Sequence, residues 1–310
     1  FNIEHFIKQK SKMLKALVTG GAGFIGSNLA LELEKQGSEV VIADNLFSGD
    51  RKNISGSKTR FINLDVSRAF ELKEKFDAIF HQASITDPRF GNDDEMLRNN
   101  IDGFKNIIEL AIKNKAKLVY ASSASVYGNG TIPMGEEQKK EILSAYSKSK
   151  LMMEGMASKY SGKMHIVGLR YFNVFGPREA HKGRPASMIY HLSQQIKAGK
   201  NPRIFKWGEQ KRDHIYVKDA VAATIMAANA KKSGIFNVGT GIGTTFNDLV
   251  KYINEALGTS LKPEYFDNPY GKNYQSNTQA DTANAIKFLG FKSKWRLQDG
   301  IKDYMKWLYG

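Results

Sequence analysis

The sequence predicts an α/β protein in which a doubly wound parallel sheet is joined to a smaller C-terminal α/β domain. Three observations support this class: short apolar runs alternate with helix-like segments, a glycine-rich turn follows the first run, and the pattern changes beyond Arg178. The chain has 310 residues, 41% of them hydrophobic, which is enough for a large core and favours one large domain with an appendage.

The apolar runs recur at the spacing expected for strands that are separated by helices. In chain order they are KALVTG, EVVIAD, RFINLDV, DAIFHQA, KLVYASSA, HIVGLRYF and GIFNVGT. Between them, SNLALELEKQG and NIDGFKNIIELAIKNK carry apolar residues on one helical face, and the first of these ends at Gly37, a typical helix stop. We therefore expect a parallel sheet with helices on both faces.

Two domains are expected. Residues 13–172 should form the first, and the chain should re-enter it at about 214–243 through the strand-like GIFNVGT. Residues 173–213 and 244–310, which contain shorter elements and a final amphipathic stretch, should form a cap over the carboxyl edge of the sheet. Residues 1–12 should form a tail.

Composition narrows the possible partners. The chain carries 46 Lys+Arg against 31 Asp+Glu, a net charge of +15, which favours an anionic partner. Charge alone does not choose between nucleic acid and a phosphate-bearing small molecule. The absence of cysteine excludes disulfides, thiolate nucleophiles and Cys-based metal sites. No apolar stretch is long enough for a bilayer and no signal-peptide pattern is present, so we expect a cytoplasmic protein without a membrane partner.

The segment LKALVTGGAGFIGSNLA predicts a dinucleotide-binding turn. Gly20, Gly23 and Gly26 follow an apolar run and open a helix, where missing side chains permit a tight turn, approach of a pyrophosphate and close helix packing. Asp44 ends the next run, where its carboxylate can accept hydrogen bonds from an adenosine ribose. Because the following NLFSGDRK includes Arg51, which suits a 2′-phosphate, NAD and NADP both stay open.

A second motif, SAYSKSK, places Tyr146 and Lys150 four residues apart on a predicted helix. The two side chains share a helix face, and a nearby ammonium group stabilises a phenolate and lowers the pKa of the phenol. Such a pair occurs by chance about once in a chain of this composition, but this one follows the fifth run, which ends with Ser122 and Ser123. A hydroxyl there can polarise a carbonyl that gains or loses hydride.

Together, the glycine motif, SSASVYG, Tyr146 with Lys150 and RYFNVFGP make the sequence similar to the extended short-chain dehydrogenases/reductases that act on nucleotide sugars. The resemblance runs from about Leu14 to the C-terminus. It implies a Rossmann-type first domain with tightly bound NAD(P), a cap that binds a nucleoside-diphosphate sugar, and epimerisation by transient oxidation and re-reduction. It also implies a homo-oligomer without a nucleic-acid partner.

The resemblance assigns roles to individual residues. It implies that Tyr146 is the acid/base, that Lys150 holds the nicotinamide ribose and that Ser123 assists. Besides the residues named above, cofactor contacts are expected from Phe24, Ile25, Asn45, Asp65, Val66, Gln82, Ala83, Ser84, Asn100 and Val174.

Three stretches, FNVFGPREAHKGRPASMIYHL, KRDHIYVKD and YQSNTQAD, resemble the ADP-L-glycero-D-manno-heptose 6-epimerase branch of this family. In that branch the lysine of HKG, here Lys182, is a second acid/base opposite the tyrosine. Arg212 is expected to bind pyrophosphate through its planar guanidinium fork. The complete set of substrate contacts that the resemblance implies is Ser123, Asn173, Arg184, His191, Phe205, Arg212 and Tyr274.

Two alternatives stay open. ADNLFSGDRKNI and SITDP are similar to UDP-glucose and UDP-N-acetylglucosamine 4-epimerases, in which Tyr146 alone would serve both faces of the sugar and Lys182 would be a bystander or phosphate contact. Arg184-Pro185 also departs from the heptose branch, which usually has a small polar residue after HKG. The second alternative is a dinucleotide-binding regulator that has lost catalysis.

Four histidines and the three tryptophans are expected to be structural. His5, His81, His165 and His214 lack metal-ligand spacing with acidic residues, so we predict satisfied structural histidines and no metal. Core packing is expected for three aromatic residues of the cap, Trp207, Trp295 and Trp307.

Overall fold

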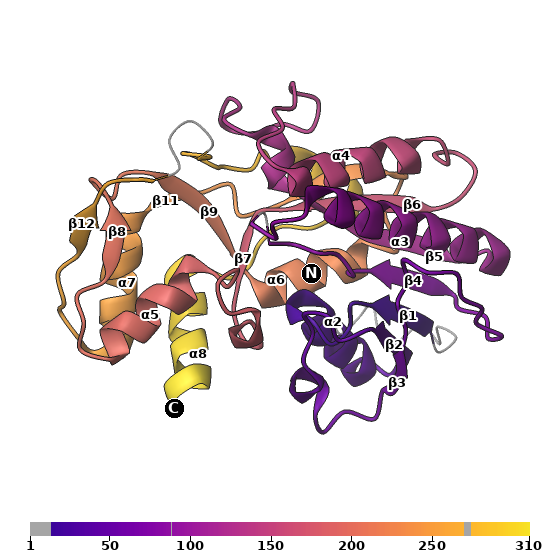
Figure 1. Cartoon of the computed structure of the whole chain (residues 1–310), viewed down its shortest axis with the longest axis horizontal. Coiled ribbons are helices and arrows are strands. Elements are labelled where there is room, and N and C mark those ends of the chain that lie inside the picture. Colours follow the sequence, from indigo (N-terminus) through magenta and orange to yellow (C-terminus); the bar gives the residue numbers. More distant parts are fainter. Residues whose placement is uncertain (1–13, 88, 270–273) are drawn as a thin grey trace.

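The computed structural model describes residues 14–87, 89–269 and 274–310, and the predicted tail at 1–12 lies outside the described residues. Figure 1 shows a large sheet flanked by helices, joined to a smaller part in which α5, α7 and α8 lie beside short strands. The predicted α/β class is confirmed.

The large sheet has seven strands, all parallel, in the order β10-β6-β5-β4-β1-β2-β3. Each predicted run forms one of them: β1 (Lys15–Thr19), β2 (Glu39–Asp44), β3 (Arg60–Asn63), β4 (Ala78–His81), β5 (Lys117–Ser123), β6 (Ile166–Tyr171) and β10 (Gly234–Val238). The chain builds outward from β1 in one direction and then, from β4 on, in the other. The carboxyl ends of β1 and β4 therefore form the switch point at which sheets of this kind bind ligands.

Helices cover both faces of this sheet. They are α2 (Phe24–Lys35), α3 (Asp93–Asn114), α4 (Ala145–Ser158) and α6 (Val217–Ala227). Leu29 of α2 and Ala220 of α6 share one core cluster with Val18, whereas Phe104 of α3 and Met153 of α4 share another with Leu17. Because neighbouring residues of a strand point to opposite faces, α2 and α6 cover one face and α3 and α4 the other.

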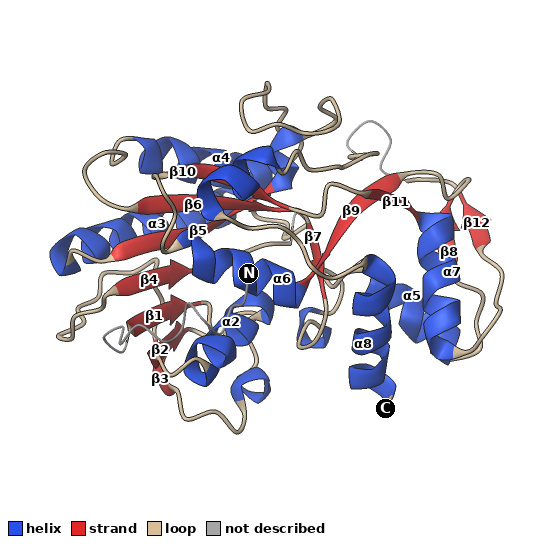
Figure 2. Cartoon of the chain, turned by 180° about the vertical axis from the view of Figure 1, so that it is seen from behind, coloured by secondary structure: helices blue, strands red, loops and turns tan. Residues whose placement is uncertain are grey.

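The smaller part contains two further sheets and three helices (Figure 2). Their elements are β7 (Asn173–Phe175), β9 (Lys211–Tyr216) and β11 (Gly243–Thr245) in one sheet, β8 (Arg203–Phe205) and β12 (Glu264–Phe266) in the other, and α5 (Met188–Lys197), α7 (Phe246–Leu257) and α8 (Leu297–Tyr309). The described residues also form short helical turns: η1 (Arg51–Ile54), η2 (Ala124–Tyr127), η3 (Ala180–Lys182) and the π-helix η5 (Ala285–Leu289).

The chain leaves the large sheet after β6, and returns to it through α6 and β10. The predicted domain limits at 172 and at about 214–243 stay a prediction. No helix of the described residues combines the length and the apolar character needed to span a membrane.

The expectation for the tryptophans is wrong for two of the three. Trp295 is half-buried and packs edge-on against Tyr216, with ring centroids 4.9 Å apart. Trp207 is 65% exposed and Trp307 is 50% exposed. Trp207 follows β8 in a turn, where its ring meets the edge of exposed Tyr265, and Trp307 lies on α8 outside its set of buried residues. Apolar neighbours in the sequence therefore did not bury the side chains of Trp207 and Trp307.

Candidate active site

The glycine-rich turn connects β1 to α2 at the switch point. Gly20 has a φ of +67°, and a Cβ atom there would lie 2.5 Å from the backbone nitrogen of Ala83, just after β4. A Cβ on Gly26 would overlap the carbonyl oxygen of Gly20. Gly23 caps α2 without a side-chain hydrogen bond, and the first turn of α2 has no acidic residue. The N–H groups and the positive dipole end of α2 are therefore available to a pyrophosphate, so the turn fits a dinucleotide.

Asp44 lies at the carboxyl end of β2, beside this turn. Its carboxylate is buried and accepts hydrogen bonds from the backbone N–H groups of Ala22 (3.0 Å) and Leu46 (2.8 Å). Burial raises the pKa of Asp44, and these two hydrogen bonds act in the opposite direction. The carboxylate is thus held in place where an adenosine ribose would approach the strand end.

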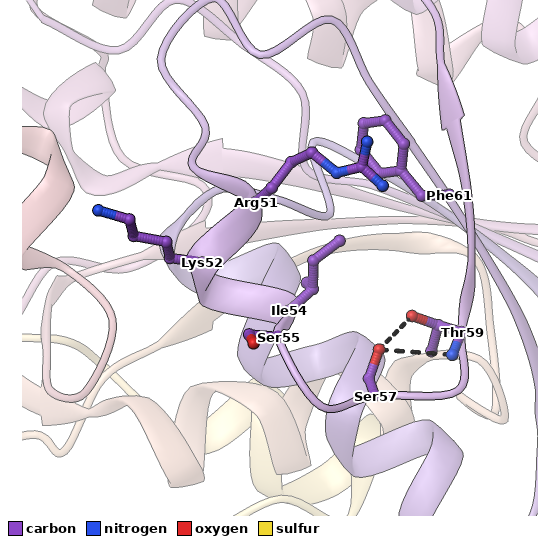
Figure 3. Close-up of a pocket in the computed structure, with 7 residues that line it drawn as sticks. All are labelled: Arg51, Lys52, Ile54, Ser55, Ser57, Thr59 and Phe61. Carbon is purple, nitrogen blue, oxygen red and sulfur yellow. Dashed lines mark hydrogen bonds between the residues drawn. The ribbon is translucent and has the colours of Figure 1, made fainter.

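Arg51 is directed elsewhere. Its guanidinium lies over the ring of Phe61 (Figure 3). The distance from the guanidinium carbon to the ring centroid is 4.4 Å. Both residues line a cavity of about 390 Å³ beneath η1, which Asp44 does not line. The guanidinium that was predicted to bind a 2′-phosphate is therefore stacked on an aromatic ring.

Ser123, Tyr146 and Lys150 come together at the ends of β5 and α4. Ser144 and Ser147 form a capping box that starts α4 and so fixes Tyr146 in its first turn. The ammonium of Lys150 is buried, donates to the carbonyl oxygen of Ala121 of β5 (2.9 Å) and lies 5.6 Å from the ring centroid of Tyr146. This places the three predicted catalytic side chains on neighbouring elements.

The protonation of this group differs from the expectation. Burial raises the pKa of Tyr146, and the hydrogen bond with the Ser123 side chain only partly opposes this. Burial lowers the pKa of Lys150 to about 7, with the charge of Glu154 acting in the opposite direction. The expected lowering of the phenol pKa by the lysine is thus wrong for this structure, because desolvation dominates both groups.

The other predicted cofactor residues surround the switch point or its neighbouring loops. The Asn100 side chain bonds to the backbone of Ile85 and to Ser149, so it clamps the loop after β4 to α4. The Asp65 carboxylate accepts from Ser67, and the Gln82 amide donates to the Tyr171 hydroxyl. The remaining positions lie in the first turn of α2 or in the segments that follow strands: Phe24, Ile25, Asn45, Val66, Ala83 and Ser84.

A cavity of about 540 Å³ lies between β7, β8, β9 and β12. Its wall contains six of the residues predicted for the site: Asn173, Val174, Lys182, Phe205, Arg212 and Tyr274. Among the described residues that line it, four are cationic and none is Asp or Glu, so we call it the cationic cavity; Arg89, Lys182, Arg203 and Arg212 supply the charge. A cavity with this charge suits a polyanion such as a diphosphate.

Arg212 is fixed in this wall. Its Nη1 donates to the carbonyl oxygens of Lys211 (2.9 Å) and Ser276 (2.7 Å), and its guanidinium lies 4.9 Å from the ring centroid of Tyr274. The Phe205 ring packs edge-on against Tyr274 and Phe266. The guanidinium, a planar donor held in place by these hydrogen bonds, therefore lies beside an aromatic surface. This arrangement suits a nucleoside diphosphate.

Lys182 lies where this cavity approaches the glycine turn. Its ammonium is 5.5 Å from the ring centroid of Phe24, the first residue of α2. The loop that carries it is tied to α2, because the Asn28 amide donates to the carbonyl oxygen of Pro177 and the Arg178 guanidinium donates to the Asn28 side chain. Burial lowers the pKa of Lys182, and the charges of Glu179 and Asp87 oppose this.

Glu179 anchors the same loop from within and was missed by sequence reasoning. Its carboxylate has no exposed surface and accepts from the N–H of Gly176 (3.1 Å) and from the N–H and hydroxyl of Ser187 (2.6 and 2.8 Å). The signal for it was an acidic residue three positions before Lys182. Glu179 fixes both ends of the loop and supplies a negative charge near the ammonium.

Some predicted residues lie apart from the cavity. Ser123, Tyr146 and Lys150 do not line it. Arg184 is exposed, and its carbonyl oxygen is near the His191 ring nitrogen Nε2 (3.2 Å), so these two residues contact each other outside the cavity wall. The lining residues that sequence reasoning missed include Arg89, Arg203, Gln210 and His214.

The histidines differ from one another. The ring of His165 is paired with the Ala227 carbonyl oxygen (2.9 Å), as expected of a structural histidine. His81 pairs one nitrogen with Thr19, but its Nε2 has no partner among the described residues, and neither nitrogen of His214 has one. The expectation of satisfied rings is therefore wrong for His214 and half wrong for His81, whereas His5 lies outside the described residues. No group of three His, Asp or Glu side chains suited to a metal occurs in the part of the chain that the structure describes.

Comparison with known proteins covers both parts of the chain. Residues 16–239 match the NAD dependent epimerase/dehydratase family. The chain is 38% identical to an ADP-L-glycero-D-manno-heptose-6-epimerase of Brachyspira hyodysenteriae over 305 residues, which cover 93% of this chain and 96% of that protein. The crystal structure of the Helicobacter pylori ADP-L-glycero-D-manno-heptose-6-epimerase superposes with a TM-score of 0.91 at 36% identity, covering 96% of this chain and 97% of that one.

A third relative is a UDP-N-acetylglucosamine 4-epimerase from Methanobrevibacter ruminantium, solved in complex with UDP-N-acetylmuramic acid. It superposes with a TM-score of 0.89 at 30% identity, covering 96% of this chain and 99% of that one. Both kinds of epimerase therefore share the whole architecture, and the side chains of the cavity must distinguish them.

Proposed function

Because the chain belongs to the NAD dependent epimerase/dehydratase family, we propose that it is a nucleotide-sugar epimerase whose substrate is an ADP-glycero-manno-heptose, inverted at C6. The family and the NAD-dependent enzyme class inferred from the sequence are thereby confirmed. The observation that supports the heptose is the position of Lys182, which lines the cationic cavity and lies beside the dinucleotide turn, where this proposal needs a second base.

The proposed reaction inverts a carbon by removing and returning hydrogen. The bound dinucleotide supplies the hydride acceptor for the oxidation and the hydride donor for the reduction. Tyr146 or Lys182 takes the hydroxyl proton as the carbinol becomes a ketone. After the planar ketone has turned, the other residue donates a proton to the oxygen, which now lies on the opposite side. No net oxidation results.

Other residues bind and orient the substrate in this proposal. Arg212, with its guanidinium held by two backbone carbonyls, binds the diphosphate, and the aromatic surface formed by Phe205 and Tyr274 contacts the base. Lys150 holds the nicotinamide ribose and Ser123 hydrogen-bonds to the reacting oxygen beside Tyr146. Asn173 lies on the cavity wall next to the diphosphate.

The experiment is a direct comparison of substrates. The purified protein is incubated separately with ADP-glycero-manno-heptose, UDP-glucose and UDP-N-acetylglucosamine, and the products are examined by NMR for inversion at C6 or C4. Inversion of the heptose at C6 with much slower hexose turnover is the expected result. Preferential inversion of a UDP-hexose at C4 would replace the heptose with the alternative substrate, and turnover of none of them would favour the non-catalytic regulator.

We expect the protein to bind NAD at least about tenfold more tightly than NADP. In this proposal the buried Asp44 carboxylate binds the adenosine ribose and would repel a 2′-phosphate there, and Arg51 is stacked on Phe61. Fluorescence titration of the cofactor-free protein with both dinucleotides measures the preference.

Two variants separate the local effect from a general charge effect. Asp44→Asn is expected to reduce the difference in affinity between NAD and NADP, because the repulsion between the carboxylate and the 2′-phosphate is removed. Asp50→Asn removes an acidic charge at the N-cap of η1 and is expected to leave the preference as in wild type. Equal or tighter binding of NADP by the wild type would contradict the assignment of Asp44.

The proposal includes a homo-oligomer in the cytoplasm. Two of the exposed apolar side chains belong to helices that pack on each other, Ile112 of α3 (48%) and Met152 of α4 (45%), and the proposal uses these helices for self-association. The absence of cysteine suits a reducing compartment.

A further inference from the structure

His214 is a buried polar side chain in the wall of the cationic cavity. It lies in β9 and is 4% exposed, and it lines the cavity together with Arg212. Neither of its ring nitrogens has a hydrogen-bond partner among the described residues. A buried polar group without a partner is destabilising, so an imidazole in this position requires an explanation.

Strand geometry explains why the ring is directed at the cavity. Residues two apart on a strand share a face, so His214 points to the same side as Arg212, which also lines the cavity. The intervening Asp213 points to the other side, where its carboxylate accepts from the backbone of Thr240, Gly241 and Ala280. The strand therefore presents one face to the protein core and one to the cavity.

The surroundings keep the ring in one position. His214 is the register partner of Asn173 in the parallel pair of β7 and β9, and Asn173 is itself part of the cavity wall. The ring of Phe175 packs edge-on against the imidazole at 6.4 Å between centroids. Apolar packing thus orients the ring, while its two polar atoms stay unpaired.

The charge environment favours the neutral imidazole. Burial lowers the pKa of His214 to about 3, and the positive charge of Arg212 acts in the same direction. A neutral imidazole carries one N–H donor and one acceptor nitrogen. A ligand that satisfies both must offer an acceptor, such as a phosphate oxygen, and a donor, such as a hydroxyl group.

Gln210, two residues before Arg212, is a second lining side chain with an unpaired polar atom. It also lines the cavity, and its Nε2 has no partner among the described residues. Three unpaired nitrogen atoms of two side chains therefore belong to residues that line one cavity, whose four charged lining residues are all cationic.

We propose that His214 is a substrate-binding residue that donates a hydrogen bond to the diphosphate of the nucleotide sugar and accepts one from an adjoining hydroxyl, with Gln210 as a second donor. The inference rests on the proposed function in that it takes the substrate to be a nucleoside-diphosphate sugar, but it does not depend on which sugar. In the free enzyme the unpaired ring is destabilising, and the hydrogen bonds to the substrate remove this destabilisation.

The test is His214→Phe, which keeps a planar ring against Phe175 and removes both nitrogens. The variant and the wild type, each with its own bound dinucleotide, are titrated with ADP and with UDP by calorimetry, and their melting temperatures are compared. We expect a Kd for the preferred nucleoside diphosphate that is about tenfold higher, because a hydrogen bond to a charged group is lost. The Tm is expected to stay equal or rise, since a buried unpaired group has been removed.

His165→Phe is the matched control. It removes a histidine whose ring is paired with Ala227, so its Tm should fall while its Kd for ADP and UDP stays that of the wild type. His214→Gln, which restores a donor and an acceptor, should recover part of the lost affinity. The KM for the nucleotide sugar should rise with the Kd in His214→Phe, with a smaller change in kcat.

Two results would overturn the proposal. One is a wild-type Kd for both nucleotides in His214→Phe, and a fall in its Tm alongside would make the residue structural. The other is a wild-type protein that binds neither ADP nor UDP. Failure of the heptose assignment looks different, because a protein that converts another nucleotide sugar would still show the binding defect.

Discussion

Replacing Tyr146 with phenylalanine is expected to lower kcat for epimerisation by about 10³-fold, since proton transfer by a positioned side chain contributes 10²- to 10⁴-fold. The substitution removes only the hydroxyl group. It lies at the start of α4 with the Ser123 side chain as its partner and with the Lys150 ammonium nearby. Without it, no group on that side of the sugar can remove the substrate proton or return it.

The affinity for substrate should change much less than the rate. Tyr146 is not among the residues that line the cationic cavity, so the Kd for the nucleoside diphosphate should stay within about twofold of the wild type. Steady-state kinetics gives kcat, and calorimetry gives the Kd.

Tyr252→Phe is a suitable control, because it removes a tyrosine hydroxyl from α7, outside the cavity wall, and should leave kcat as in wild type. If Tyr146→Phe kept more than about a tenth of the wild-type kcat, the assignment of Tyr146 as acid/base would be wrong.

The strands and the dinucleotide turn were predictable because their signals are local. The inner strands β2 and β6 are almost entirely buried and mostly apolar, as expected where both faces are covered by helices. The glycine turn and the Tyr146–Lys150 pair depend on residues within a few positions of one another. Local sequence therefore specifies which elements form and which side chains share a helix face.

The composition of the cavity was not predictable in full, because its wall is assembled from distant segments. Arg89 follows β4, Arg203 belongs to β8, and Gln210 and His214 belong to the β9 region. Asp213 shows how such segments are joined. Its buried carboxylate connects β9 to residues 240–241 and to Ala280, which follows the stretch carrying Tyr274. No local pattern reports a hydrogen bond across such a separation.

Protonation was the least predictable property. The Tyr146–Lys150 spacing suggested a phenol with a lowered pKa, but the effect of burial exceeds that of the neighbouring groups. The number of atoms that surround a group depends on the whole fold. The same reason explains why His214, which has an ordinary position in sequence, has an unpaired ring in the structure.

Replacing Lys182 with methionine is expected to lower kcat for inversion of the heptose by about 10²-fold or more, because the second proton-transfer group is lost. Methionine keeps an unbranched apolar stem against Phe24 and removes the ammonium. The loop should keep its position, since Glu179 bonds to Gly176 and Ser187 and the Asn28 amide holds Pro177.

The two-base proposal makes a further demand on this variant. Tyr146 still serves one side of the sugar, so the ketone can form from one epimer and be reduced back on the face from which it came. With that epimer, reduced dinucleotide should therefore form faster than the inverted product appears. Rapid-mixing absorbance spectroscopy follows the reduced dinucleotide, and NMR follows the inversion.

A matched lysine is available on the neighbouring helix. Lys197 of α5 is exposed and lies over the ring of Tyr309, so Lys197→Met loses one positive charge and one cation–π contact and should retain the wild-type kcat. If Lys182→Met inverted its substrate at the wild-type rate, a single residue would serve both faces of the sugar. The whole sugar would then have to rotate in the cavity, which is the mechanism expected of the UDP-hexose 4-epimerase alternative. Lys182 is therefore the side chain whose removal separates the two candidate reactions.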